Sequence, residues 1–137
     1  MKKFLFMFVF CLILTSFRSN ETVYYPVSII ELIADPKQYK DLPIGVAGFI
    51  VYEFEHQAIY FTSESAKKSM FRNGIRLITD SNTVWKSRSG AKVNILKIQA
   101  GQSVSVNGIF EPDKYRPSYN LFSGSIAVDE IYILDNK

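Results

Sequence analysis

Ile44-Gly45-Val46-Ala47-Gly48-Phe49-Ile50 and Val104-Ser105-Val106-Asn107-Gly108-Ile109-Phe110 are two similar stretches, with Val46 and Val106 sixty residues apart. In each stretch, apolar residues two apart lead to a glycine inside an otherwise strand-like run. A glycine within a strand typically marks a bulge or a tight bend where the sheet curls. The two stretches therefore predict a small closed β-barrel.

The remaining elements are placed by their local signals. Ser28 and Glu31 have the spacing of a capping box, and the residue before Pro36 cannot stay helical, which predicts a short helix over residues 29–34. A hairpin is expected over residues 44–62, with its turn at His56-Gln57 or the neighbouring residues. Further strands are predicted at 75–79, 103–110 and 121–134, and residues 80–100 form an irregular insertion with a short strand or helix. Five aromatic residues are expected to point inward, namely Phe49, Tyr52, Phe54, Phe61 and Phe110.

Five strands with an insertion between the third and fourth match the order of an oligonucleotide/oligosaccharide-binding (OB) fold. The matching segments are Val27-Ser28-Ile29-Ile30-Glu31-Leu32, Ile44-x-Val46-x-Gly48-Phe49, Glu53-Phe54-Glu55 and Val104-x-Val106-x-Gly108-x-Phe110. In these segments the chain resembles small exported bacterial proteins of the OB-fold class whose role is unassigned. The resemblance implies a mainly β, five-stranded, partly open Greek-key barrel with a short N-terminal helix. It also implies that the first and fourth strands are neighbours, with Gly48 and Gly108 near the same corner.

The N-terminal residues have the features of a secretory signal. Met1-Lys2-Lys3 precedes an apolar run from Phe4 to Leu14, which is shorter than the roughly 20 residues that span a bilayer. We expect a signal peptide over residues 1–19 and one periplasmic or secreted domain over 20–137; an uncleaved anchor is the alternative. The only cysteine, Cys11, lies inside the apolar run, so the mature domain uses neither disulfides nor thiolate chemistry.

Charge is unevenly distributed along the chain. The sequence has 16 basic and 13 acidic residues, and a cut after Ser16 would remove Lys2 and Lys3, which leaves 14 basic residues and a net charge of +1. Residues 67–97 contain eight bases and a single acid, Asp80. This basic segment is either a solvated face or a surface that meets a polyanion. The nearly neutral total argues against tight nucleic-acid binding, which depends on many phosphate contacts.

Few residues suggest catalysis. The single histidine, His56, is expected at a hairpin turn as an ordinary surface residue, and one histidine without cysteine makes a zinc site improbable. Glu53 and Glu55 lie two apart and would share the outward face of a strand, where they are either solvated or serve as the acid and base of a small hydrolase. We therefore expect a protein that is not an enzyme and that needs no cofactor or metal.

Rings and bases outside the expected strands are the best candidates for binding. Trp85 and the loop over residues 113–119 mix aromatic and cationic side chains, as loops of this barrel class do where they bind ligands. The same loop could instead pack as a cap on its own barrel. The candidate ligand-binding residues are Arg76, Trp85, Lys86, Arg88, Lys92, Lys97, Tyr115, Arg116 and Tyr119.

The sequence thus favours an exported, non-enzymatic binding module of the cell envelope. Its expected partner is an unknown protein or an anionic envelope polymer, and contact with a membrane is expected only through an uncleaved signal. The alternatives are the small hydrolase based on Glu53 and Glu55 and a weak binder of polyanions or nucleic acids.

Overall fold

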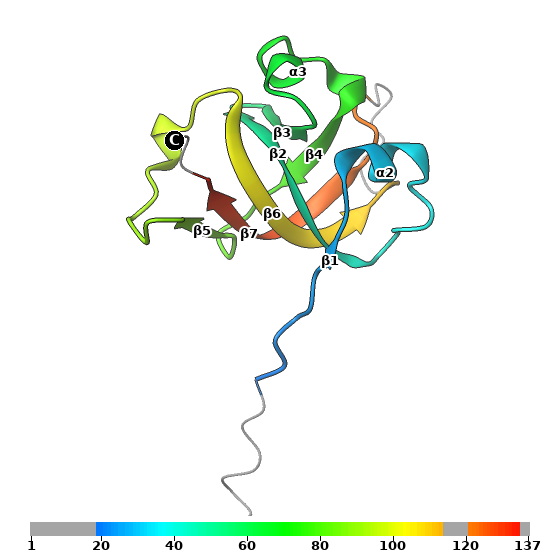
Figure 1. Cartoon of the computed structure of the whole chain (residues 1–137), viewed down its shortest axis with the longest axis horizontal. Helices are drawn as coiled ribbons and strands as arrows, with labels where there is room; N and C mark the ends of the chain where they lie inside the picture. Colours follow the sequence, from blue (N-terminus) through cyan, green and yellow to red (C-terminus); the bar gives the residue numbers. More distant parts are fainter. Residues whose placement is uncertain (1–18, 114–120, 135–137) are drawn as a thin grey trace, which may run out of the picture.

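The structure, a computed structural model, describes residues 19–113 and 121–134, and these form a mainly β fold (Figure 1). The helices are α2 (Ile29–Ala34) and α3 (Ser63–Lys67), with 3-10 turns η1 (Phe71–Asn73) and η2 (Ile95–Lys97). The strands are β1 (Tyr25–Pro26), β2 (Pro43–Glu53), β3 (His56–Tyr60), β4 (Gly74–Ile78), β5 (Val84–Ser87), β6 (Gln102–Glu111) and β7 (Ser125–Ile133). In this described part, no helix is long and apolar enough to cross a membrane.

Helix α2 has the predicted bounds and the predicted capping box. The Glu31 backbone N–H donates to Ser28 Oγ at 3.1 Å, and the Ser28 backbone N–H donates to Glu31 Oε2 at 2.8 Å. The two bonds satisfy amides that have no partner within the helix. Ile29 and Leu32 are fully buried, so the helix is fixed to the core by one apolar side.

All seven strands belong to one mixed sheet, which has two strands more than the sequence predicts. β2 pairs antiparallel with both β3 and β6, β3 pairs antiparallel with β4, and β6 pairs antiparallel with β7. β4 pairs in parallel with the beginning of β7, at Ser125–Ala127. The short strands β1 and β5 are added in parallel to β2 and β7.

Two apolar clusters stabilise the sheet. The main core lies on the inner face of the curled sheet and includes Val46, Ile50, Val106 and Ile131, which are almost completely shielded from solvent. A smaller cluster lies on the outer face of β2 and β3, where α3 covers it, and consists of Val51, Ala58, Tyr60 and Ala66. Burial of such side chains supplies most of the favourable free energy of folding.

The predicted adjacency of the strands that carry Gly48 and Gly108 is confirmed, but the predicted common corner is wrong. β2 and β6 are antiparallel, with Gly48 opposite Val104 and Ile44 opposite Gly108, so the two glycines lie at opposite ends of the pairing. Each glycine does allow a close approach of backbone. A Cβ on Gly48 would lie 2.5 Å from the Tyr60 carbonyl oxygen, and one on Gly108 would overlap the Ala127 carbonyl oxygen.

A β-bulge lies beside Gly108 in the pairing of β6 with β7. Asn107 is opposite Glu130 and Gly108 is opposite Val128, so Asp129 is the extra residue. Val128 and Ile131 on either side both point into the core. Asp129 and Glu130 are therefore consecutive residues that both face outward, as bulges allow.

The hairpin between β2 and β3 turns earlier than expected. Glu53 pairs with His56, so Phe54 and Glu55 make the turn, and His56 is a strand residue rather than a turn residue. Phe54 and Phe61 are 94% and 50% exposed, so their predicted inward orientation is wrong. Both residues lie just beyond the end of a strand, where the alternation of the strand no longer determines which way a side chain points. Tyr52 and Phe110 face the main core as predicted, whereas Phe49 packs against the cluster on the outer face, so its predicted inward orientation is also wrong.

Residues 80–100, predicted as an irregular insertion with a short strand or helix, contain both the strand β5 and the 3-10 turn η2. β5 extends the sheet beyond β7, pairing Trp85 with Ile131 and Lys86 with Tyr132. Trp85 therefore lies in a strand, contrary to the prediction. Its ring packs edge-on against Tyr52, with 4.8 Å between ring centroids, and it contacts the main core.

Candidate ligand-binding site

The predicted basic site is not assembled among the described residues. Arg76 lies on β4 opposite Ser125, whereas Lys86 lies on β5 opposite Tyr132. Ser125 and Tyr132 are seven positions apart on β7, which corresponds to roughly 23 Å along a strand. Arg88, Lys92 and Lys97 are exposed and lie after β5. Tyr115, Arg116 and Tyr119 lie outside the described residues.

Two of these side chains have structural partners. Trp85 is partly buried and packs edge-on against Tyr52 and the main core, so at least part of its ring contributes to packing. Lys86 Nζ donates to Glu130 Oε1 at 2.9 Å and to the Tyr132 hydroxyl at 3.2 Å. The positive charge of Lys86 is thus already balanced by a neighbouring carboxylate.

The proposed acid pair lies at the hairpin turn, with Glu53 just before the turn and Glu55 within it. Glu53 and Glu55 are both exposed, and Glu55 has a positive φ of 66°, which belongs to the turn conformation. Neither residue lines the two hollows described below. Within residues 19–113 and 121–134, no group of three or more histidine, cysteine or acidic side chains could hold a metal ion.

A hollow of about 740 Å³ lies on the outer face of β2 and β6, beside the N-terminal segment. Its floor is made of small or polar side chains, because Gly45 and Ala47 on β2 lie opposite Asn107 and Ser105 on β6. The other lining residues are Tyr24, Pro26, Val27 and Ser28. We call this feature the outer-face hollow.

The floor remains low because Gly45 has no side chain. A Cβ at this position would lie 3.0 Å from Asn107 Oδ1 and 3.7 Å from Tyr24 Cβ. The inward neighbours of these floor residues, such as Val46 and Val106, are anchored in the main core. A rigid sheet thus supports the hollow, and such support favours precise binding.

Tyr24 forms one wall and reaches across the sheet to β7. Its hydroxyl donates to Asp129 Oδ2 at 2.9 Å. Burial raises the pKa of Tyr24 to about 12, and the hydrogen bond and negative charge of Asp129 contribute to the same shift. The phenol is therefore neutral and a donor at physiological pH.

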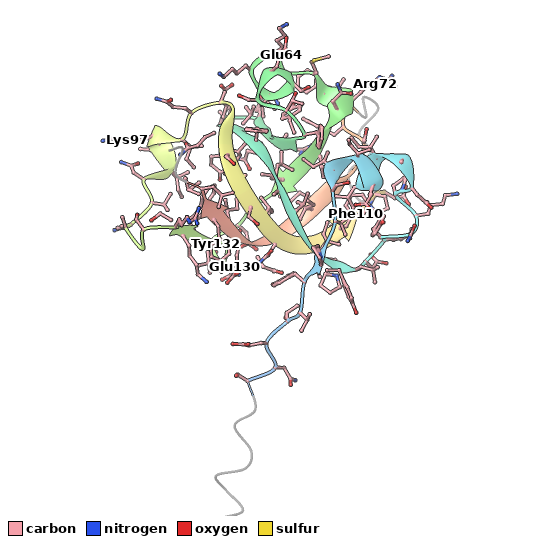
Figure 2. All side chains as sticks on the ribbon, in the orientation of Figure 1. Glu64, Arg72, Lys97, Phe110, Glu130 and Tyr132 are labelled. Carbon is pink, nitrogen blue, oxygen red and sulfur yellow. The ribbon has the colours of Figure 1, made fainter. Side chains whose placement is uncertain are left out.

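A network of polar side chains continues the outer face from Asn107 onto β7 and β5. Asn107 Nδ2 donates to Glu130 Oε2 at 3.4 Å, and the Tyr132 hydroxyl donates to the same oxygen at 3.0 Å. The hydrogen bond from Lys86 lowers the pKa of Glu130, and the bond to Glu130 raises the pKa of Lys86. Figure 2 labels Glu130 and Tyr132, which lie close together on this side of the molecule.

A second, smaller hollow of about 360 Å³ lies near η1. It is lined by Met70, Phe71, Arg72, Asn73 and Leu121. Figure 2 shows Arg72 and Glu64 near α3 and well separated from Glu130 and Tyr132. The two hollows therefore lie on different parts of the surface.

Behind the smaller hollow, His56 belongs to an aromatic cluster. His56 Nε2 and the Tyr60 hydroxyl are 2.8 Å apart, and the His56 ring contacts Phe71 and Phe122 with centroid distances of 5.0 and 5.9 Å. Burial lowers the pKa of His56, although the charge of Glu53 acts in the opposite direction. Burial also raises the pKa of Tyr60 to about 12. His56 is thus a partly buried packing residue and not an ordinary surface histidine.

Sequence reasoning did not find the outer-face hollow, although a signal for it was present. The outward positions of the two look-alike strands are Gly45 and Ala47 in one and Ser105 and Asn107 in the other. Small outward residues on two adjacent strands predict a depression once the strands are known to pair. The contribution of Tyr24 depends on long-range geometry, because its partner Asp129 is 105 residues away.

Comparisons with known proteins give little information about this chain. No protein-family model and no curated protein matches it. Four chains of solved structures match, one of which is described as an aspartyl-tRNA synthetase from Leishmania major Friedlin. The match has 9% sequence identity and a TM-score of 0.46, and it covers 85% of this chain and 22% of that chain. The chain thus spans about a fifth of the length of that protein, and a score this low does not establish a shared fold.

Proposed function

We propose that the mature chain is an exported, non-enzymatic binding module of the cell envelope, built on an OB-like barrel. Its ligand site is the outer-face hollow, and not the basic residues expected from the sequence. The observation that carries this proposal is the position of a wide hollow with a floor of small residues next to a network of polar side chains. Its volume falls within the roughly 300–1,000 Å³ typical of ligand sites.

The strand pairings support the OB-like barrel. β2, β3, β4, β7 and β6 pair in that order, and β6 pairs back to β2, which makes a circuit of five strands. Such a circuit supports the proposed barrel, because closure of a sheet removes exposed edges in small β proteins. β1 and β5 lie outside the circuit and extend it at β2 and β7.

The location of the site follows from what covers each face. OB folds commonly bind through the face of their second and third strands, which correspond to β3 and β4. Here α3 covers β2 and β3, and Ala66 packs against Val51, Ala58 and Tyr60. The outer face of β2 and β6 bears no such cover in the described part of the chain, and its small side chains leave room for a ligand.

A hydrolase based on Glu53 and Glu55 is less well supported. Hydrolysis of a sugar chain requires two carboxyl groups on either side of a bound substrate. Glu53 precedes a tight turn, Glu55 lies within it, and neither residue lines either hollow. The bulge at Asp129, in contrast, gives the outer-face hollow a polar edge, and bulges are frequent beside functional sites.

The test uses two exposed alanines. Ala47 lies on the floor of the hollow and Ala91 lies in the loop after β5, so Ala47→Trp fills the site and Ala91→Trp is its matched control. The mature domain should sediment with isolated bacterial envelope material, and Ala47→Trp should reduce the bound fraction about tenfold, whereas Ala91→Trp should not. Equal binding of both variants, or absence of wild-type binding, would refute the proposed site.

A further inference from the structure

We propose that the ligand of the outer-face hollow is an uncharged, hydroxyl-rich polymer, that is, a neutral glycan. This inference rests on the function proposed above and specifies the chemistry of its ligand. It differs from the anionic polymer that the basic segment suggests.

The charged side chains near the hollow disfavour an anion. Asp129 and Glu130 lie beside it on β7, and Lys86 is the cation bonded to Glu130. These three groups carry a net charge of −1, and the Lys86 ammonium already interacts with Glu130 and Tyr132. The described lining of the hollow includes no lysine or arginine, so an anionic polymer would meet the like charge of this edge there.

The hydrogen-bonding groups favour a ligand that both donates and accepts. Carboxylates only accept, whereas the Asn107 amide and the Ser105 and Tyr132 hydroxyls can do both. A sugar hydroxyl also combines one donor with acceptor lone pairs, so it can pair with every one of these groups without bringing a charge. A phosphate or sulfate could accept from the Asn107 and Ser105 donors, but it brings no donor for the two carboxylates and its charge is repelled by them.

The walls of the hollow add apolar surface. Tyr24, Pro26, Val27 and Ala47 line it together with the polar floor residues. Sugar rings present C–H faces as well as hydroxyls, so they can pack against a tyrosine or proline ring and bond to the floor at the same time. The hydrogen bond from Tyr24 to Asp129 fixes the tyrosine side chain and reduces the entropy lost when a ligand binds.

An extended peptide is disfavoured by the backbone pairing. A peptide commonly binds to a sheet by adding a strand to an exposed edge. Over the floor of the hollow, β6 is paired on both sides, with β2 and with β7. The other side of β2 is paired with β1 at Ile44 and Gly45 and with β3 from Phe49 onward, which leaves only residues 46–48 between the two pairings, a stretch too short for an added peptide strand.

The experiment compares three soluble probes by isothermal titration calorimetry on the mature domain. The probes are the N-acetylglucosamine tetramer as a neutral glycan, a heparin oligosaccharide as an anion and spermine as a cation. We expect the neutral tetramer to bind, with affinity nearly unchanged between about 50 and 200 mM salt, because no counterions are released. Ala47→Trp should weaken this binding about tenfold, whereas Ala91→Trp should leave it unchanged.

A second floor variant and a stability measurement separate loss of binding from misfolding. Ser105→Gln places a longer side chain on the floor of the hollow from β6, the neighbouring strand. The thermal midpoint of each variant shows whether that variant remains folded. Amide chemical shifts of the wild-type domain provide a readout without any substitution. With the tetramer present, shifts should concentrate at Gly45, Ala47, Ser105 and Asn107.

The outcomes separate the ligand class from the site. Binding of heparin or spermine alone that is sensitive to Ala47→Trp would overturn the neutral ligand and retain the outer-face hollow. Absence of tetramer binding, while binding to envelope material remains sensitive to Ala47→Trp, would have the same meaning. Tetramer binding that is unaffected by both floor variants would overturn this inference and the proposed site together.

Discussion

Replacement of Gly48 by alanine should destabilise the protein because its missing side chain allows three groups to meet. A Cβ here would lie 2.5 Å from the Tyr60 carbonyl oxygen, 2.7 Å from Ile29 Cδ1 and 2.9 Å from Ile59 Cγ1. The oxygen belongs to β3, which pairs with β2, and both isoleucines are fully buried, so none of these groups moves easily. Forcing one carbon into such a site costs about 1–3 kcal/mol. For a domain of this size, 2 kcal/mol lowers the thermal midpoint by about 6–12 °C.

Gly45→Ala is the matched control on the same strand. Its Cβ would come within 3.0 Å of Asn107 Oδ1, which is the end of a side chain on the outer face and can rotate away. This variant should change stability by less than about 0.5 kcal/mol. Urea denaturation of both variants measures the difference. Equal midpoints would show that the close packing of Gly48 against β3 and α2 is not a constraint on the fold.

Three further results are expected. Ser28→Ala removes the acceptor of the Glu31 amide and should lower the free energy of unfolding by about 1 kcal/mol in urea denaturation; an unchanged midpoint would contradict the capping box. Burial lowers the pKa of His56 in the folded state, so its contribution to stability is complete above the unfolded pKa of about 6.5 and is lost as the pH falls through and below that value. His56→Gln should therefore reduce the change in thermal midpoint between about pH 7.5 and 5.5, and an unaltered pH dependence would refute this role. Tyr24→Phe deletes the bond to Asp129, so spectrophotometric titration should lose one of the two tyrosines with a pKa of about 12, the other being Tyr60; an undiminished amplitude near pH 12 would contradict the contact.

Local signals in the sequence predict much of the secondary structure. The capping residues Ser28 and Glu31 act within one turn, and the bounds of α2 agree with the structure. The alternation in residues 44–50 and 104–110 reports burial on one face, and β2 and β6 are found there. These signals are reliable because each depends on residues that are close in the chain.

Errors arose where distant residues decide the outcome. Phe54 continues the alternation of β2, but the chain turns at that residue, so its side chain is exposed. Trp85 lies in a segment without clear alternation, and only the pairing of β5 with β7 makes it a strand residue. The bulge that turns both Asp129 and Glu130 outward depends on the register of β6 against β7, which no local pattern reports.

The candidate site shows the same limit. Basic residues are easy to find in a sequence, but the sequence does not show that Lys86 on β5 is paired with Glu130 on the neighbouring strand β7. The outer-face hollow is built from residues with little individual character, such as Gly45, Ala47 and Ser105. They form a hollow only because the register of β2 and β6 places them side by side and because Tyr24 reaches across the sheet beside them to Asp129.

The most direct test of the account is hydroxyl-radical footprinting of the mature domain with and without bacterial envelope material. Tyr24 lies in the wall of the outer-face hollow and Tyr132 lies in the adjoining network, whereas Phe54 is 94% exposed at the hairpin turn and serves as the internal reference. We predict that oxidation of Tyr24 and Tyr132 falls relative to Phe54 when envelope material is bound. An unchanged ratio, or protection of Phe54 and Met70 in place of the two tyrosines, would contradict the outer-face hollow as the ligand site.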